Sequence, residues 1–426
     1  MQKPKWYRLD NSGLIYPMVI TQSTQSLYRL GVKLRDEVNP HFLRVAVNTA
    51  LERFPYFRVE LKKGFFRHYL DENVRTPVVE EDDGVLLKIF NFRHNRYYLF
   101  RITYFGKRIF IDFFHGLCDA NGGIEFLKTV VYYYYKTAND KFSKGNVMTL
   151  SDPEMKEEIE DAFTKYYKDF DFFKGVKKMA SGNGFMVKDK QFAHEGFGLI
   201  QGEVNTEALL AAARRHNCTI TAYLSALALL SVAKNYGESR QKEDFIAFIP
   251  INLRKKYPSK TMFNFTNFAK CPVPRNAKTD LDEFISYVKA ALNEQLTEEE
   301  LQLKLSFSSL MGKMPLLKFM PLFIKSFISR FSRDFSSKTK QTMIISNLGR
   351  VDINAGDRVD HFLFNLNVSE RTPVNMGIIS YGNKTIISFT RKVINTKIEE
   401  EFFKFLATEC GEVKVISNFR EENDVL

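Results

Sequence analysis

Apolar positions along this chain alternate between the spacing of helices and the spacing of strands. Helical spacing predicts helices over residues 41–54, 121–136, 206–216, 221–235, 281–296 and 399–408. Runs rich in aromatic and β-branched residues predict strands over residues 56–69, 85–92, 96–104, 108–114, 245–252, 263–271, 342–346, 362–368, 375–381 and 385–390. Because the two kinds of element follow one another in turn, the pattern predicts an α/β fold built on mixed sheets.

The same pattern predicts two globular subdomains. Residues 1–141 form the first and residues 197–426 the second, and the polar, glycine-punctuated segment 142–196 is predicted to be a crossover linker. A strand, a Tyr-Phe-Gly-Lys turn, a strand and a helix in the first subdomain have a counterpart around a Tyr-Gly-Asn-Lys turn in the second. The subdomains are therefore candidate copies of one unit, although ordinary βαβ recurrence produces the same order.

Composition narrows the class of protein. The chain has 426 residues, of which 62 are Lys or Arg and 50 are Asp or Glu, so its formal net charge is +12. With 44% apolar residues and 40 Phe, it has the composition of a globular protein with a large core, which excludes a disordered chain. The N-terminus lacks the apolar stretch of a signal peptide and no run is long enough to span a bilayer, so a cytoplasmic protein is expected.

Metal and nucleic-acid binding are not expected. Four cysteines, Cys118, Cys218, Cys271 and Cys410, lie far apart, without a CxxC pair or a histidine at zinc-finger spacing, so neither structural zinc nor a disulfide framework is predicted. The positive charge is compatible with nucleic-acid binding, but nothing resembles a recognised nucleic-acid-binding motif.

A basic, Phe-rich stretch covers residues 303–335. Residues 304–340 hold eight Lys or Arg against one acid. This stretch could touch a membrane surface peripherally, or it could hold the phosphates of a substrate. Pro315 and Pro321 interrupt it, so packed helices with a solvated basic side explain the sequence equally well.

Candidate chemistry centres on His115, which follows a buried strand and precedes a helix. Signatures of phosphate loops, dinucleotide folds, serine hydrolase elbows and zinc proteases do not occur in the chain. Bulky aromatics precede His115, and Gly122 and Gly123 follow it at the helix start. Such a histidine could act as a general base beside anion-stabilising amides, or it could be a structural core histidine. Cys118, three residues later, is expected to be a small buried apolar residue rather than a nucleophile.

Two stretches of the second subdomain place polar side chains at the ends of apolar strands. Residues 250–254 (PINLR) end on Arg254 and are followed by Asn264, and residues 346–351 (SNLGRV) begin with Ser346 and Asn347. Ser346 could donate a hydrogen bond to a developing oxyanion, or it could form a turn with Asn347.

Together these motifs resemble the chloramphenicol acetyltransferase-like superfamily, whose members include condensation domains, plant acyltransferases and bacterial alcohol O-acetyltransferase-like proteins. Its HxxxD motif corresponds here to residues 115–119 (HGLCD), followed in order by PINLR and SNLGRV. Residues 6–10 (WYRLD) and 53–57 (RFPYF) are similar to the bacterial alcohol acetyltransferase branch, so the resemblance covers nearly the whole chain.

The resemblance implies two similar subdomains that meet at a tunnel, with the HxxxD loop at its centre. It implies acyl transfer from a thioester, acyl-CoA in the first instance, to a small-molecule alcohol or amine, with His115 as general base. Asp119 would be a structural part of the catalytic motif and pair with Arg254, and Ser346 would face the thioester carbonyl. Gly122, Asn264 and Asn347 would support the site. No metal and no tightly bound cofactor are implied, and a monomer is expected.

Two departures from the family pattern leave alternatives open. Ala120 stands where members usually carry glycine after the motif aspartate, and the DFGWG stretch of plant-type members is missing. The first departure bears on loop geometry, and the second is expected of the bacterial branch. A condensation-like domain acting on carrier-bound substrates, or a catalytically idle binding protein of the same fold, would share the motif.

Overall fold

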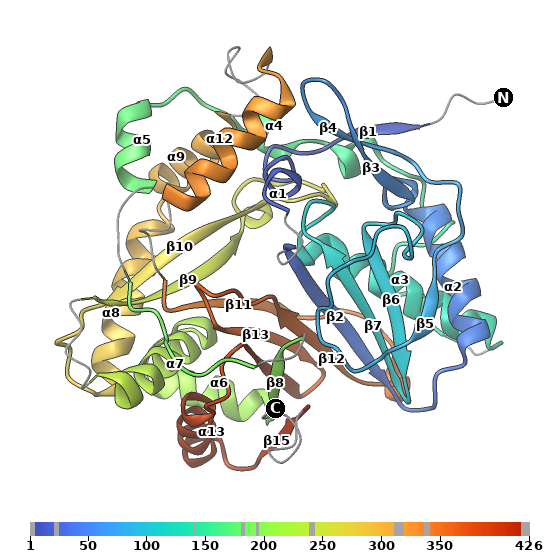
Figure 1. The fold of residues 1–426 in the computed structure, drawn as a ribbon. Helices are drawn as coiled ribbons and strands as arrows, with labels where there is room; N and C mark the ends of the chain where they lie inside the picture. The colour runs from blue at the N-terminus through green and yellow to red at the C-terminus, as the bar shows by residue number, and fades with distance from the viewer. Residues whose placement is uncertain are drawn as a thin grey trace.

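The fold has two lobes, each built around a mixed sheet (Figure 1). The computed structural model describes residues 5–20, 25–139, 142–179, 184–192, 196–237, 243–310, 319–335 and 341–418. In these ranges the first lobe contains a five-stranded sheet of order β12 (Val359–Leu366), β2 (Leu27–Leu34), β7 (Arg108–Phe114), β6 (Phe100–Phe105) and β5 (Val79–Glu81). A smaller sheet in the same lobe joins β1 (Trp6–Arg8), β4 (His68–Glu72) and β3 (Val59–Lys63). The predicted mixed α/β class is confirmed.

Two helices pack together on the first lobe: α2 (Pro40–Arg53) and α3 (Ala120–Thr137). Helix α2 begins where the sequence predicts, because the Asn39 side chain accepts a hydrogen bond from the backbone N–H of His41 at 2.9 Å and Pro40 occupies the first turn. Its apolar face, which includes Leu43, Val47 and Leu51, is fully buried. The cap thus sets the start of this helix, and the apolar period sets its buried face.

The second lobe is built on a seven-stranded sheet. Its order is β10 (Thr266–Val273), β9 (Phe245–Asn252), β11 (Met343–Arg350), β13 (Val374–Tyr381), β14 (Lys384–Arg391), β8 (Gly198–Asn205) and β15 (Val413–Ser417). Helices α6 (Thr206–Arg215), α7 (Ile220–Tyr236), α8 (Leu281–Gln295) and α13 (Lys397–Cys410) share its apolar core. None of the helices in the described ranges could cross a bilayer alone; α6 and α7 reach the necessary length and apolarity only as a pair bent by 79°.

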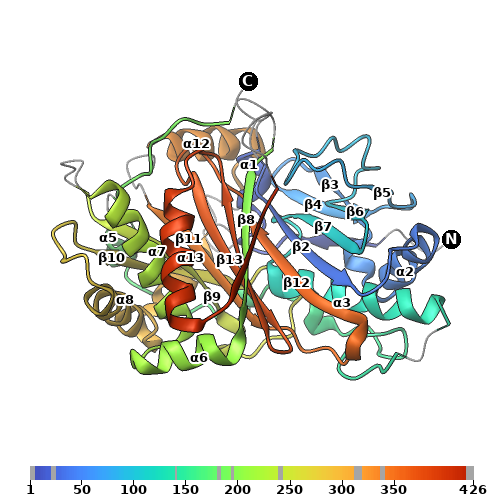
Figure 2. The same cartoon turned by 90° about the horizontal axis from the view of Figure 1, so that it is seen from below.

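Strand β12 ties the lobes together. It comes from the second half of the sequence, yet it pairs antiparallel with β2 at the edge of the first sheet, with Phe364 opposite Leu30. Figure 2 shows β12 beside β2, between the two sheets. The segment 142–196 also contributes to the packing: it contains short helices α4 (Ala162–Lys165) and α5 (Phe172–Met179), and its buried Glu158 pairs with Arg53 at 2.7 Å.

Several strand predictions are wrong in detail. Residues 85–92 form a loop, because the positive φ of 53° at Leu87 interrupts an extended strand. The side chains of Leu86 and Phe90 are nevertheless buried in the core, which explains the apolar pattern. The region 56–69 divides into β3 and the start of β4, joined by a turn. Strand β2 was not predicted, because Arg29 interrupts its apolar pattern; the buried guanidinium is paired with Asp112 at 2.6 Å.

Candidate functional site

Asp119 is the N-cap of α3, one short turn beyond the end of β7. Its Oδ1 accepts hydrogen bonds from the backbone N–H groups of Asn121 at 3.1 Å and Gly122 at 3.2 Å. Ala120 is the first helical residue and is not among the residues of positive φ. Alanine is therefore compatible with the local turn, although the resembled family usually has glycine there.

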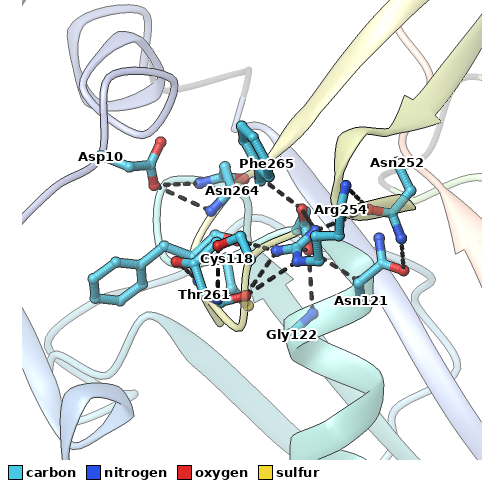
Figure 3. Close-up of polar contacts among 12 residues, drawn as sticks. Asp10, Cys118, Asn121, Gly122, Asn252, Arg254, Thr261, Asn264 and Phe265 are labelled. Carbon is cyan, nitrogen blue, oxygen red and sulfur yellow. Dashed lines mark hydrogen bonds and ion pairs between the residues drawn. The ribbon is translucent and has the colours of Figure 1, made fainter. Parts of the chain in front are cut away.

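Arg254 joins Asp119 across the lobe boundary, the pairing that the family resemblance implies. Its two terminal nitrogens lie 2.7 Å and 3.2 Å from the two carboxylate oxygens of Asp119. The same guanidinium donates to the backbone carbonyls of Thr261 and Phe263, and the Phe265 N–H donates to Asp119 Oδ2 at 2.8 Å. One ion pair, between the buried Asp119 and the partly buried Arg254, therefore holds the loop of residues 115–119 against the loop that precedes β10 (Figure 3).

Gly122 lets these two loops approach closely. A Cβ atom at this position would lie 2.0 Å from the carbonyl oxygen of Met262, well inside van der Waals contact. Its neighbour Asn121 accepts a hydrogen bond from the Asn252 side-chain amide at 2.9 Å. Both contacts join the start of α3 to the second lobe.

His115 is oriented by a chain of hydrogen bonds that ends on Asp10. Its Nδ1 lies 2.9 Å from Asn264 Oδ1, and Asn264 Nδ2 donates to Asp10 Oδ2 at 3.0 Å. The Asn264 backbone N–H also donates to that oxygen, and the Gly13 N–H donates to Asp10 Oδ1. Because Asp10 accepts from the Asn264 amide nitrogen, the amide oxygen faces His115, so Nδ1 carries the proton and Nε2 is free to act as base.

Aromatic rings enclose the imidazole. Tyr16 stacks on His115 with ring centroids 4.6 Å apart, and Tyr28 meets it edge-on at 5.2 Å. Burial lowers the pKa of His115, and the nearby charge of Asp119 opposes that shift only in part. Burial also raises the pKa of Asp10 to about 7, with a further contribution from the charge of Asp161. The imidazole is therefore neutral at pH 7.

A cavity of about 410 Å³ lies between the lobes and is lined by four of the predicted residues, whereas Gly122, Arg254 and Asn264 lie outside its lining. His115 and Asp119 line it from the first lobe, and Ser346 and Asn347 from the second. This volume is in the range of small-molecule sites. Ser346 lies on β11 and is mostly buried.

Asn347 has a structural role besides lining the cavity. Its side-chain amide donates to Thr221 on α7 at 3.0 Å, and its amide oxygen accepts from the Gly349 N–H at 2.8 Å. These bonds hold the register shift in β11 between Asn347 and Arg350. Cys118 is fully buried, and burial raises the pKa of its thiol, so its environment is that of a core residue.

A second cavity, of about 310 Å³, adjoins the first and shares Asn121 and Leu348 with it. Its lining contains four basic side chains, those of Lys128, Arg254, Lys260 and Arg350, and two acidic ones, those of Glu125 and Asp352. None of the described residues of the basic stretch 303–335 lines either cavity. Positive charge near the site therefore comes from other segments of the chain.

Asp10 and Tyr16 are site residues to which the sequence reasoning assigned no role. Asp10 is the last residue of the WYRLD stretch. This stretch resembles the bacterial alcohol acetyltransferase branch, but the resemblance assigns no chemical role to its aspartate. That stretch lies more than 100 residues from His115, and only the folded chain brings Asp10 next to Asn264. Among the described residues, no group of three or more His, Cys, Asp or Glu side chains could hold a metal ion.

Comparisons with known proteins agree with this architecture. A family model for the C-terminus of phthiocerol/phthiodiolone dimycocerosyl transferase matches residues 202–359. No curated protein sequence gives a match.

Solved structures with two such lobes match nearly the whole chain. Polyketide synthase associated protein 5 from Mycobacterium tuberculosis has a TM-score of 0.64 at 14% identity, over 96% of this chain and 99% of that one. Trichothecene 15-O-acetyltransferase from Fusarium sporotrichioides has a TM-score of 0.63 at 8% identity, over 94% of each chain. The starter condensation domain of rhizomide synthetase, in complex with C8-CoA and Leu-SNAC, has a TM-score of 0.58 at 12% identity, over 96% and 95%. The chain therefore has the fold shared by condensation domains and chloramphenicol acetyltransferase-like acyltransferases.

Proposed function

We propose that this protein is an acyltransferase that moves an acyl group from a thioester, acyl-CoA in the first instance, to a hydroxyl or amine. The observation that carries the proposal is the state of His115. Its Nδ1 is engaged by Asn264, its pKa is lowered by burial, and it lines an interlobe cavity large enough for a small molecule. A neutral, oriented imidazole of this kind is what a general base requires.

The reaction follows from these positions. His115 Nε2 takes the proton of the acceptor O–H or N–H as its oxygen or nitrogen attacks the thioester carbonyl carbon. The carbonyl π electrons move to the oxygen, and we assign the stabilisation of this oxyanion to the Ser346 hydroxyl, which lines the same cavity. When the tetrahedral intermediate collapses, the carbon–sulfur bond breaks and the imidazolium returns its proton to the departing thiolate. Neither metal nor bound cofactor enters this scheme.

The second cavity suits the phosphate-bearing end of the donor. It adjoins the His115 cavity, and its wall carries Lys260 and Arg350, whereas its other two basic side chains, Arg254 and Lys128, are paired with Asp119 and Glu125. Phosphates gain charge-assisted hydrogen bonds from such groups. The rhizomide synthetase condensation domain of the same fold is described with C8-CoA, which supports a CoA thioester as co-substrate.

A panel of acyl-CoAs offered with small alcohols and amines tests the proposal, with release of free CoA thiol as the readout. We expect thiol release that depends on the acceptor and yields the corresponding ester or amide. The same acyl groups on a carrier protein provide the comparison for a condensation-like enzyme. Binding without thiol release from any donor would favour a catalytically idle protein and overturn the proposal.

Reversing charge in the second cavity should separate donor binding from chemistry. In Lys260→Glu/Arg350→Glu, KM for acyl-CoA should rise about tenfold or more, because each lost phosphate contact weakens binding by roughly 1 kcal/mol or more. The KM for an N-acetylcysteamine thioester, which lacks the phosphates, should not change. Equal effects on both donors would contradict this placement of the phosphates.

The pH profile should report both His115 and Asp10. Because only neutral His115 accepts a proton and its pKa is lowered, kcat/KM should fall as the pH drops through a value below the ordinary histidine pKa of about 6.5. Asp10 has a pKa of about 7, so its ionisation on raising the pH strengthens its hold on Asn264 and should add a second inflection near neutrality.

Asp10→Asn should remove the upper inflection and leave the lower one. It should also lower kcat above neutral pH by about tenfold or more. The introduced side-chain amide lets the Asn264 amide group flip, which favours the His115 tautomer that carries its proton on Nε2. In other enzymes, the wrong tautomer of a catalytic histidine lowers kcat by up to about 10⁴-fold. KM should change little. A variant with both inflections intact would show that Asp10 does not position His115.

A further inference from the structure

We propose that the protein docks on an anionic lipid bilayer surface through an exposed aromatic face. The aromatic face consists of six side chains that are 41–71% exposed: Trp6, Phe65, Phe66, Phe319, Phe323 and Phe327. These residues lie outside both cavities of the candidate active site. The proposal stands on this surface alone and is independent of the reaction assigned to His115.

Helix α12 (Leu322–Phe335) and the residues just before it turn an aromatic row outward. Phe323 and Phe327 are both 71% exposed, and their spacing of four places them on one side of α12; Phe319, just before the helix, is 62% exposed. In the sequence, phenylalanine recurs at every fourth position from 319 to 335. A helix on the surface of a globular protein normally buries such a row, so this row is available to an apolar environment outside the chain.

The inner side of α12 is anchored through polar contacts. Lys325 is almost fully buried, and its Nζ donates to the carbonyl oxygen of Phe66 at 2.7 Å. The Leu322 N–H donates to the carbonyl oxygen of Phe65 at 2.8 Å. The helix is therefore held in this orientation by bonds to the turn between β3 and β4, with a lysine inside and phenylalanines outside.

Neighbouring segments extend the aromatic face. Trp6 from β1 and Phe65 and Phe66 from the β3–β4 turn surround a hollow of about 420 Å³ that also includes Phe319. The rings of Phe66 and Phe319 meet edge-on with centroids 6.3 Å apart. Figure 1 shows α12 and the β3–β4 turn at the same end of the molecule. Three separate segments thus present aromatic rings to one region of solvent.

Charge indicates which kind of surface would cover these rings. The described residues that line the hollow include Arg8 and Arg67 and no acid, and the Arg8 guanidinium lies 5.9 Å from the Trp6 ring centroid. Aromatic rings beside basic groups are typical of bilayer-surface binding: rings enter the headgroup boundary, while arginines pair with anionic lipids.

A second copy of the chain is the competing occupant. A twofold interface centred on this face would bring Arg8 and Arg67 against the same residues of the other copy. Among the described residues that line the hollow, there is no acidic side chain to compensate them. An anionic bilayer can both take up the aromatic rings and pair with the arginines. We therefore propose the bilayer as the partner of this face.

The aromatic face lies beside one wall of the candidate active site. Helix α12 packs against α1 (Ile15–Met18), and α1 carries the Tyr16 ring that stacks on His115. Docking would therefore hold this part of the cavity wall near the bilayer surface.

Co-sedimentation with vesicles tests the proposal. The full chain should bind vesicles of equal parts phosphatidylcholine and phosphatidylglycerol, and bind phosphatidylcholine vesicles more weakly. Phe323→Ser/Phe327→Ser should lower the partition coefficient on the mixed vesicles by about tenfold or more, because two apolar side chains no longer enter the boundary. Phe105→Ser is the matched control: this side chain is 55% exposed on the β6–β7 hairpin, away from α12, and should bind as the parent does.

The remaining variants decide between occupants. Arg8→Glu/Arg67→Glu should lose the preference for phosphatidylglycerol, and His115→Ala should bind vesicles like the parent. Equal vesicle binding by the parent and Phe323→Ser/Phe327→Ser would overturn the proposal. It would also be overturned if the parent ignored vesicles but formed a dimer in sedimentation velocity that the two serines abolished. Thiol release from soluble substrates should be the same in Phe323→Ser/Phe327→Ser and the parent.

Discussion

Replacing His115 with alanine should lower kcat by about 10²- to 10⁴-fold while the chain stays folded. That range is what a positioned general base contributes when its pKa suits the working pH. His115 meets this condition because burial keeps the imidazole neutral and Asn264 directs the free Nε2 toward a substrate. Single-turnover thiol release from acyl-CoA measures the effect on the chemical step, and thermal melting measures the fold.

A buried histidine outside the site provides the matched control. His68 on β4 is also buried, and burial lowers its pKa to about 4. His68→Ala should reduce thermal stability and leave kcat per folded molecule unchanged. His115→Gln keeps a side chain of similar length. It therefore shows whether a loss of activity in His115→Ala comes from disturbed packing against Tyr16 or from the missing imidazole. If His115→Ala and His115→Gln both turn over like the parent, His115 is not the base.

Asp119→Asn should cost about 3–5 kcal/mol of stability, the usual cost of removing one partner from a buried ion pair. Asparagine can still cap α3 through its oxygen, so the N-terminus of the helix keeps its hydrogen bonds. Its amide nitrogen, however, would face the Arg254 guanidinium and the Phe265 N–H, which both donate to Asp119 Oδ2 now. Denaturant unfolding should show the loss, with a lower melting temperature.

Two further variants separate the ion pair from general effects of charge. Asp119→Asn/Arg254→Met should recover part of the lost stability, because it leaves no unpaired guanidinium between the lobes. Glu400→Gln breaks the exposed Lys404–Glu400 pair on α13 and should be hard to distinguish from the parent. If Asp119→Asn were as stable as Glu400→Gln, the pair would not hold the lobes together.

Local sequence determined the elements that bear the site. The Asn39–Pro40 cap and the apolar period set α2, and the runs of residues 108–114 and 245–252 coincide with β7 and β9. His115, Arg254 and Ser346 could be selected from sequence because each lies close to the end of such an apolar run. Neighbouring residues are enough for these predictions, since caps and periodicity are short-range properties.

Long-range contacts decided the rest. Strand β2 cannot be recognised from local sequence, because its buried Arg29 is stabilised by Asp82 and Asp112, which are distant in sequence. Residues 85–92 looked like a strand because buried loop residues and strand residues are equally apolar, and only packing distinguishes them.

The same limit applies to the site and the surface. The sequence by itself identified His115, Asp119 and Arg254, and the resemblance implied the ion pair between the last two. Asp10 acquires its role only when folding brings it against Asn264, 254 residues away. The outward orientation of α12 was also beyond the sequence, because periodicity shows that one side of a helix is apolar and not whether that side faces the core. Tertiary contacts decide that, here the bonds of Leu322 and Lys325 to the β3–β4 turn.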